Sequence, residues 1–228
     1  MKNLAVVFVL LFTLIVINDL RSQSAPQIYD YDSKWKEIDS LYNYGLPESA
    51  MKILQEVFVN AKGENNTVQY VRALLYKMKL TQYNVEDAFF ASLSEMKSEE
   101  AAAVFPMKQF LNSLIGDMYW TYYQNNRYDL LERTRVENFT LEDIKTWDAS
   151  KIIEQSIQYY KNSISEPERL QQISLEGYND MLNNYVYDKY IPNGRKYRPT
   201  LYDFLAFKAI GFFSNKEAGV TRPAEQFL

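Results

Sequence analysis

The sequence contains no cysteine and no histidine among its 228 residues. Without cysteine, the chain has no thiol nucleophile, no disulfide and no N-terminal Cys for lipid attachment. Without histidine, it lacks the usual general base, the Ser-His-Asp arrangement and the commonest zinc ligand. Carboxylate chemistry or a Ser-Lys dyad stays formally possible, but no spacing in the sequence favours either. We therefore expect a protein that is not an enzyme and that holds no metal and no cofactor.

Glycine and proline are also scarce, with seven of each. Sandwiches and barrels need many Gly/Pro turns, so this scarcity favours helices joined by short connections. Apolar residues make up 47% of the chain, which is ample for a core, and the length allows one or two compact domains. The net charge of −4 supplies no broad cationic surface for phosphates, which argues against a nucleic-acid partner.

The N-terminus has the pattern of a signal peptide. A positive start, Met-Lys-Asn, precedes an unbroken apolar run at 4–17. The run is shorter than the roughly 20 residues that span a bilayer, and it fits the apolar part of a signal peptide. The small residues that follow predict a signal peptide at 1–24, cleaved between Ser24 and Ala25. Cleavage before Gln23 is a close alternative, and a retained membrane anchor is the other interpretation. Membrane contact is expected only through an uncleaved signal segment.

Apolar residues recur at helical spacing through the next part of the chain, from 25 to 213. The first helix is expected to begin at Asp32 or Ser33, and the next at Pro47 after a Gly-Leu-Pro break. Further helices are expected from Val68, and at 85–97, 101–124, 140–164, 168–183 and 201–213. Pro106 could instead be the first-turn proline of a helix that begins slightly later than 101. Two Thr-x-x-Asp strings, at 140 and 200, predict capping boxes. The apolar positions expected in the core include Leu75, Val104 and Phe213. We expect a loop at 185–197 and a C-terminal linker or tail at 214–228.

Two stretches are similar to tetratricopeptide-type (TPR) hairpins. In the first, large residues from Trp35 onward precede Gly45, and Ala50 follows five residues later. In the second, Gly116 lies between two large residues, where a small residue would let two helices approach closely. No clean period of about 34 residues emerges. The sequence therefore predicts an all-α fold of antiparallel helical hairpins, either a TPR-like α-solenoid or an irregular helical bundle.

Three strings are candidates for ligand binding. Tyr-Trp-Thr-Tyr-Tyr at 119–123 and Tyr-Val-Tyr at 185–187 could stack on sugars or peptides. Packing between helices is the stronger interpretation of both. The basic string Arg-Lys-Tyr-Arg at 195–198 could dock an acidic partner, but a solvated loop before a helix explains it better.

Carboxylates are the remaining candidates for chemistry. They occur in pairs at 99–100 and 142–143 and singly at Asp148. Catalytic pairs need a buried environment that separates their pKa values, and nothing in the sequence predicts one. We therefore assign no catalytic, cofactor-binding or metal-binding residue.

Several strings in a fixed order resemble one known family. They are Gly-Leu-Pro at 45–47, Tyr-Trp-x-Tyr-Tyr at 119–123, Thr-Trp-Asp at 146–148 and Arg-Pro-Thr-Leu-Tyr-Asp-Phe-Leu at 198–205. In this order they resemble the N-terminal helical region of large exported α2-macroglobulin-like proteins of Gram-negative bacteria. The resemblance extends over nearly the whole mature chain, from about Tyr31 to Phe227.

The resemblance implies a periplasmic, or otherwise extracytoplasmic, protease inhibitor. Family members contain many β-sandwich macroglobulin domains, a bait region and often a thioester, which requires a cysteine. This chain has no cysteine, and the sandwiches and the bait region are absent from it, as expected of a truncated or fragment chain. No functional residue carries over. The resemblance thus implies a non-catalytic scaffold or docking module whose partner is another protein or the downstream macroglobulin domains.

A second interpretation is a self-standing exported TPR-like module that binds a protein or peptide. The DNA after the Leu228 codon discriminates between the two. Sandwich-domain coding sequence there would support the macroglobulin interpretation, and an ordinary intergenic region would contradict it.

Overall fold

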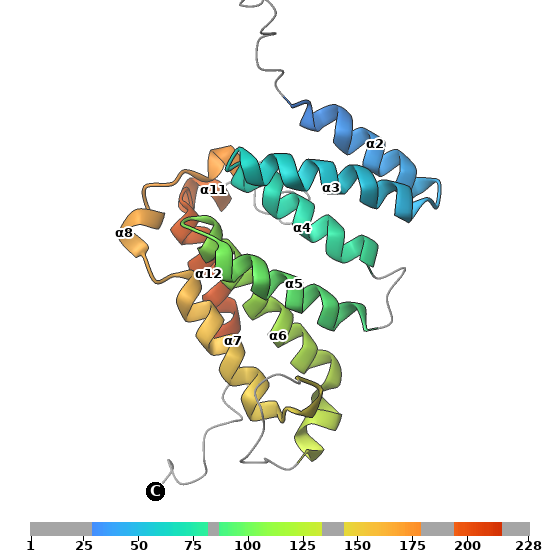
Figure 1. Cartoon of the computed structure of the whole chain (residues 1–228). Helices are drawn as coiled ribbons and strands as arrows, with labels where there is room; N and C mark the ends of the chain where they lie inside the picture. The colour runs from blue at the N-terminus through green and yellow to red at the C-terminus, as the bar shows by residue number, and fades with distance from the viewer. Residues whose placement is uncertain (1–28, 82–86, 134–143, 179–193, 216–228) are drawn as a thin grey trace, which may run out of the picture.

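The structure is a computed structural model that describes residues 29–81, 87–133, 144–178 and 194–215 (Figure 1). Within these ranges the protein is helical and no strand forms, so the predicted all-α fold is confirmed. The longer helices are α2 (Tyr31–Asn43), α3 (Pro47–Gly63), α4 (Thr67–Thr81), α5 (Ala88–Ala102), α6 (Met107–Glu132), α7 (Ala149–Ser163) and α12 (Leu201–Phe213). The short helical turns are η1 (Ile144–Thr146), α8 (Pro167–Leu170), η2 (Leu175–Tyr178) and α11 (Gly194–Tyr197).

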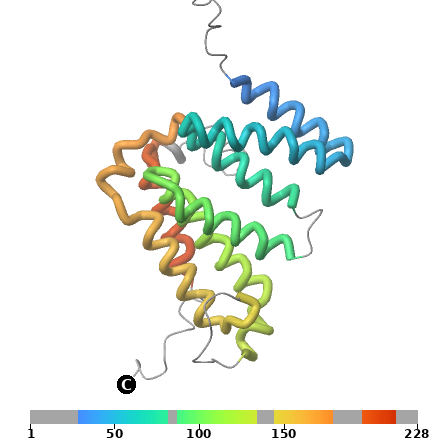
Figure 2. The backbone as a smooth tube through the Cα atoms, in the orientation of Figure 1, coloured from blue at the N-terminus to red at the C-terminus, as the bar shows by residue number. Residues whose placement is uncertain are grey.

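Helices α2 to α7 pack mainly against their neighbours in sequence. α2 contacts α3, α3 contacts α4, and the same order continues through α5 and α6 to α7, as the colours of Figure 2 show. Neighbour-to-neighbour packing of this kind characterises a helical solenoid. α12 departs from the pattern, because it returns to α6, α7 and α8. The fold is therefore an array of antiparallel hairpins whose second half closes into a bundle.

Local sequence signals account for several helix ends. Gly45 has a φ of +74°, in the left-handed region that glycine tolerates, and it lets the chain turn between α2 and α3. Pro47 occupies the first turn of α3, where its missing N–H costs no helical hydrogen bond. Thr200 and Asp203 form the predicted capping box of α12, in which each side chain accepts a hydrogen bond from the backbone N–H of the other residue.

Two helices are capped by aspartates that the sequence analysis did not assign to this role. The carboxylate of Asp30 accepts a hydrogen bond from the Ser33 backbone N–H at 3.1 Å and caps α2, so the predicted caps Asp32 and Ser33 are wrong. The carboxylate of Asp148 accepts a hydrogen bond from the Lys151 backbone N–H at 2.8 Å and caps α7. The Thr-x-x-Asp string predicted to open this region lies outside the described residues.

The bounds of α5 and α6 also differ from the prediction. α5 continues to Ala102, and α6 begins only at Met107 and then extends to Glu132. Pro106 explains the late start, because proline has no N–H and disfavours helix in the residue before it. Val104 consequently lies in the connection between the two helices and is 72% exposed, so its predicted place in the core is wrong. Leu75 and Phe213, 39% and 45% exposed, also lie outside the core.

The predicted continuous helix at 168–183 is wrong in its described part, 168–178, where α8 and η2 are two separate turns. The backbone N–H of Leu175 donates to the carbonyl of Pro199 at 2.8 Å. The N–H of Leu201 donates in turn to the carbonyl of Ile173 at 2.9 Å. This pairing with the segment before α12 takes the place of helical hydrogen bonds.

A close contact and a polar cluster hold α6, α7 and α12 together. A Cβ atom on Gly116 of α6 would lie 3.2 Å from the ring of Tyr160 of α7, so the predicted close-packing role of Gly116 is confirmed. The Tyr160 hydroxyl donates a hydrogen bond to Asp117 of α6. Lys208 of α12 forms an ion pair with the same carboxylate, which therefore links all three helices.

Candidate functional site

The aromatic string at 119–123 packs between helices. Tyr119 and Tyr123 are 0% and 2% exposed, and Trp120 is buried as well. The ring of Tyr119 stacks on Trp147 and Tyr159, with ring centroids 6.0 and 5.7 Å apart. These faces are therefore covered by protein and are not a platform for sugars or peptides. The other aromatic string, at 185–187, lies outside the described residues.

The basic string at 195–198 overlaps a helical turn, α11, where a loop was predicted. Lys196 and Tyr197 are exposed to solvent. The guanidinium of Arg198 lies over the ring of Phe207 of α12, 3.8 Å from its centroid, in a cation–π contact. Part of this string thus covers an apolar side chain of the same molecule.

The predicted carboxylates serve as structural partners where the structure describes them. Asp148 caps α7. Glu100 accepts a hydrogen bond from the Asn112 side chain at 3.2 Å and lies 3.5 Å from the Lys108 ammonium. The pair at 142–143 lies outside the described residues, as do Ser24 and Ala25 of the predicted signal cleavage site. Across the described ranges, no three acidic side chains gather as a metal site would require.

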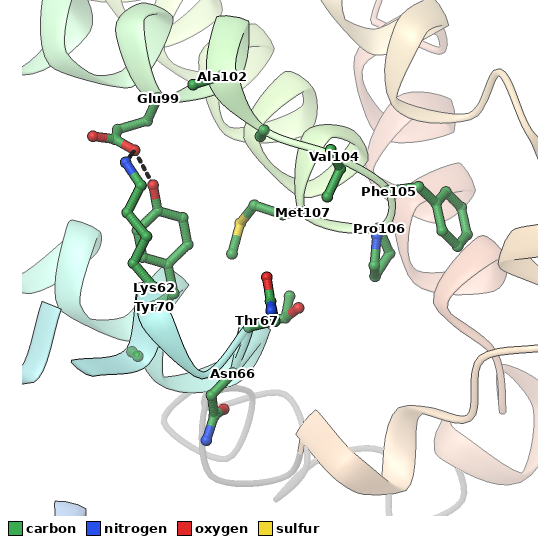
Figure 3. A pocket seen from close by; sticks show the side chains of 13 residues that line it. Lys62, Asn66, Thr67, Tyr70, Glu99, Ala102, Val104, Phe105, Pro106 and Met107 are labelled. Carbon is green, nitrogen blue, oxygen red and sulfur yellow. Dashed lines mark hydrogen bonds and ion pairs between the residues drawn. The ribbon is translucent and has the colours of Figure 1, made fainter. Parts of the chain in front are cut away.

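A pocket opens where two helical hairpins meet, between the α3–α4 connection and the α5–α6 connection (Figure 3). Its cavity volume is about 320 Å³. We call it the hairpin-end pocket. Its apolar wall comprises Ala61, Tyr70, Ala102, Ala103, Val104, Phe105, Pro106 and Met107. Its polar side comprises Lys62, Asn65, Asn66, Thr67 and Glu99. A volume of this size is at the lower end of small-ligand sites and suits a single large side chain.

The backbone around the pocket follows from local sequence. Asn65 has a φ of +54°, a left-handed conformation that asparagine tolerates better than most residues, and it turns α3 into α4. The side-chain oxygen of Asn66 accepts a hydrogen bond from the Gln69 backbone N–H at 3.3 Å at the start of α4. On the facing side, Pro106 stands at the N-cap position of α6. Residues of these two turns line opposite sides of the pocket.

A hydrogen-bonded ion pair lies on the polar side of the pocket. One carboxylate oxygen of Glu99 accepts from the Lys62 ammonium at 2.7 Å and from the Tyr70 hydroxyl. Figure 3 shows these two bonds converging on the same atom. Burial by itself would raise the pKa of Glu99, but the hydrogen bonds from Lys62 and Tyr70 outweigh it and lower that pKa. Burial and the bond to Glu99 raise the pKa of Tyr70.

The chemistry of this cluster favours binding over proton transfer. A carboxylate with a lowered pKa is a weak base at neutral pH, and a phenol with a raised pKa is a weak acid. The opposite charges of Lys62 and Glu99 offset each other, and most of the remaining wall is apolar. The pocket can therefore hold an uncharged, apolar group beside a polar edge. The pocket could not be found from the sequence, because Lys62 and Glu99 are 37 residues apart and belong to no common motif.

No protein-family model matches the chain, and neither does any curated protein or solved structure. Among the helices that the structure describes, none is both long enough and apolar enough to cross a membrane.

Proposed function

We propose that this chain is a non-catalytic protein-docking module, the N-terminal helical module of an exported α2-macroglobulin-like protease inhibitor. The order of the strings at 45–47, 119–123, 146–148 and 198–205 supports the family. The observation that carries the docking role is the hairpin-end pocket, which joins an apolar wall to a charge-compensated edge. Its partner is a loop of a downstream macroglobulin domain, which inserts one apolar side chain.

The arrangement of the pocket supports a protein partner in preference to a reacting substrate. Its carboxylate, Glu99, is already bonded to Lys62 and Tyr70, so a ligand gains little from charge. The exposed Val104 extends the apolar wall to the surface, where a partner protein can cover it. Apolar anchors that fill a pocket and exclude water supply most of the binding energy in protein interfaces.

The alternative is a self-standing exported TPR-like module that binds a peptide. The neighbour-to-neighbour packing of α2 to α7 favours it, because stacked hairpins present their connections along shared edges. The same pocket would then take a side chain of a free peptide. The DNA after the Leu228 codon separates the two proposals: β-sandwich coding sequence is expected for the first, and its absence would leave only the second.

The docking role is tested with the pocket intact, filled or made polar. Where downstream sandwich domains are encoded, their binding to the purified helical chain is measured by titration calorimetry. Ala102→Trp fills the pocket, and Val104→Asp places a charge on its apolar wall. Each is expected to weaken binding by roughly tenfold or more, as loss of an interface anchor does.

Val59→Asp is the matched control, because Val59 is also exposed, at 59%, but does not line the pocket. Equal binding by all three variants and the wild type would contradict docking through the pocket. The helical chain alone is expected to give no protection of a substrate from proteases. Stoichiometric inhibition by it would contradict the proposed non-catalytic docking role.

Export is tested separately by expressing the full chain in a Gram-negative host. The mature protein is expected in the periplasm with Ala25 as its first residue, as read by intact mass. A chain that keeps residues 1–24 and stays with the membrane would support the retained anchor instead.

A further inference from the structure

α12 has an apolar face that points away from the core. We define the α12 outer face as Phe207, Ile210, Gly211 and Ser214, which are related by helical spacings of three, four and seven residues. Phe207 is 52% exposed and Ile210 is 59% exposed, and Gly211 and Ser214 are exposed as well. The opposite side of the helix is buried against α6 and α7. α12 is therefore apolar on two sides. The described chain buries one of them, and on the other it contributes only Arg198, whose guanidinium lies over the ring of Phe207.

Gly211 makes a hollow in this face. Glycine within a helix is less favourable than alanine, so a helical glycine usually has a packing reason. At Gly116 the reason is visible, because an added Cβ would lie 3.2 Å from the Tyr160 ring. At Gly211 an added Cβ would meet nothing within 4 Å, and the helix continues beyond it. No described residue packs into the hollow at Gly211.

The outer face is complementary to itself. In an antiparallel pair centred between Ile210 and Gly211, Phe207 lies opposite Ser214 of the second copy. Ile210 lies opposite Gly211 of the second copy. Every large side chain of the face thus meets a small one, as interdigitated packing requires. We propose that the α12 outer face docks on the same face of a second copy of this chain.

Charge is also compatible with this partner. In a two-fold pair, residues near the axis meet their own copies, so a charged side chain there would repel itself. The α12 outer face carries no charged residue, and Lys208, on the flank, is paired with Asp117. Arg198 lies over Phe207, and the pairing brings it beside Ser214 of the second copy. There it faces the negative end of that helix, which favours a cation.

Sedimentation of the chain from Ala25 onward, across a dilution series, tests the pairing. The wild type is expected to form dimers that dissociate on dilution. Gly211→Leu fills the hollow and is expected to be monomeric throughout, with an unchanged helical circular dichroism spectrum, because Gly211 is exposed and an added Cβ meets nothing within 4 Å. Ile210→Glu is expected to be monomeric as well. Val59→Glu, at a position with the same 59% exposure on α3, is expected to dimerise like the wild type.

The absence of cysteine allows a direct test of the register. A mixture of Phe207→Cys and Ser214→Cys chains is expected to form a disulfide-linked dimer on mild oxidation. Neither variant alone is expected to do so, because equivalent positions lie apart in an antiparallel pair. Within one helix the two positions are roughly 10 Å apart, too far for a disulfide.

Three results would overturn the proposal: a wild type that is monomeric at every concentration, a dimer that survives both Gly211→Leu and Ile210→Glu, or a dimer that Val59→Glu alone disrupts. Cross-linking by either cysteine variant alone would overturn the register. The hairpin-end pocket takes no part in this pairing, so the result is independent of the docking role proposed above.

Discussion

Helices α6 and α12 are both rich in aromatic residues, but α6 buries an aromatic cluster whereas α12 leaves two phenylalanines about half exposed. Tyr119 and Trp120 of α6 are buried against rings from α7, α12 and the chain before α7, and Tyr123 is buried as well. Phe207 and Phe213 of α12 are about half exposed. The difference teaches that aromatic content does not distinguish a core helix from a surface helix. What decides is whether another part of the molecule lies against each side of the helix.

Adjacent phenylalanines on α12 give the sharpest form of this comparison. Phe212 is 2% exposed and lies 5.0 Å from Trp120 and 4.7 Å from Tyr160 between ring centroids, whereas Phe213 is 45% exposed. Phe212→Ala is expected to lower the free energy of unfolding by about 3–5 kcal/mol, and Phe213→Ala by less than about 1 kcal/mol. Urea unfolding of both variants measures the gap. Equal losses would mean that α12 is covered on both sides.

The two helical glycines extend the comparison to the backbone. Gly116→Ala pushes a methyl group into the Tyr160 ring and is expected to cost about 1–3 kcal/mol. Gly211→Ala meets open space and improves helix propensity, so it is expected to stabilise the fold by up to about 1 kcal/mol. Thermal unfolding followed by circular dichroism should therefore shift in opposite directions. Shifts of the same sign would refute the packing difference.

The hydroxyl of Tyr160 gives a smaller effect. It donates a hydrogen bond to Asp117, which also pairs with Lys208. Tyr160→Phe removes one of these partners and keeps the ring, so the expected loss is about 1–2 kcal/mol of unfolding free energy. Tyr197→Phe, at a 75% exposed position, is the control and should stay near the wild type. If both variants unfold alike, the cluster does not stabilise the contact between α6, α7 and α12.

Alkaline pH is expected to lower the free energy of unfolding gradually. Burial raises the pKa of Tyr119, Tyr160 and Tyr178 above the usual value near 10. The folded state then keeps these protons where the unfolded state loses them. Stability is therefore fully present below about pH 10 and falls above it, by roughly 1.4 kcal/mol per pH unit for each such group. Urea midpoints between neutral and alkaline pH measure the slope. Tyr160→Phe should make this slope shallower. An unchanged slope would contradict a raised pKa of Tyr160 in the folded state.

Much of the fold could be predicted because the signals are local. Pro47 and the Thr200–Asp203 box lie within a few residues of the helix starts that they set, and their spacing is visible in the sequence. The late start of α6 was one of two open interpretations, because Pro106 could mark the first turn of a helix that begins after 101. The end of the helix after α8 could not be predicted from the sequence. There the backbone of Leu175 pairs with Pro199, 24 residues further along the chain.

The candidate site lay beyond sequence reasoning for a similar reason. Lys62 was visible only as part of a helix end, and Glu99 only as one of two adjacent carboxylates. Lys62 on α3 and Glu99 on α5 come together only because the helices packed between and beside α3 and α5 set the distance between these two helices. The strings that were singled out as binding candidates, by contrast, proved to contain buried core residues at 119–123 and a side chain stacked on its own molecule at Arg198.

The sequence by itself determined that the chain is helical and where many of its helices begin, because apolar spacing, proline and capping side chains act over one or two turns. Only the tertiary structure decided which apolar faces are covered, which ring lies against Gly116 and where the hairpin-end pocket opens. Those outcomes depend on neighbours that are remote in sequence, because burial is a property of the packed surfaces and not of any one segment.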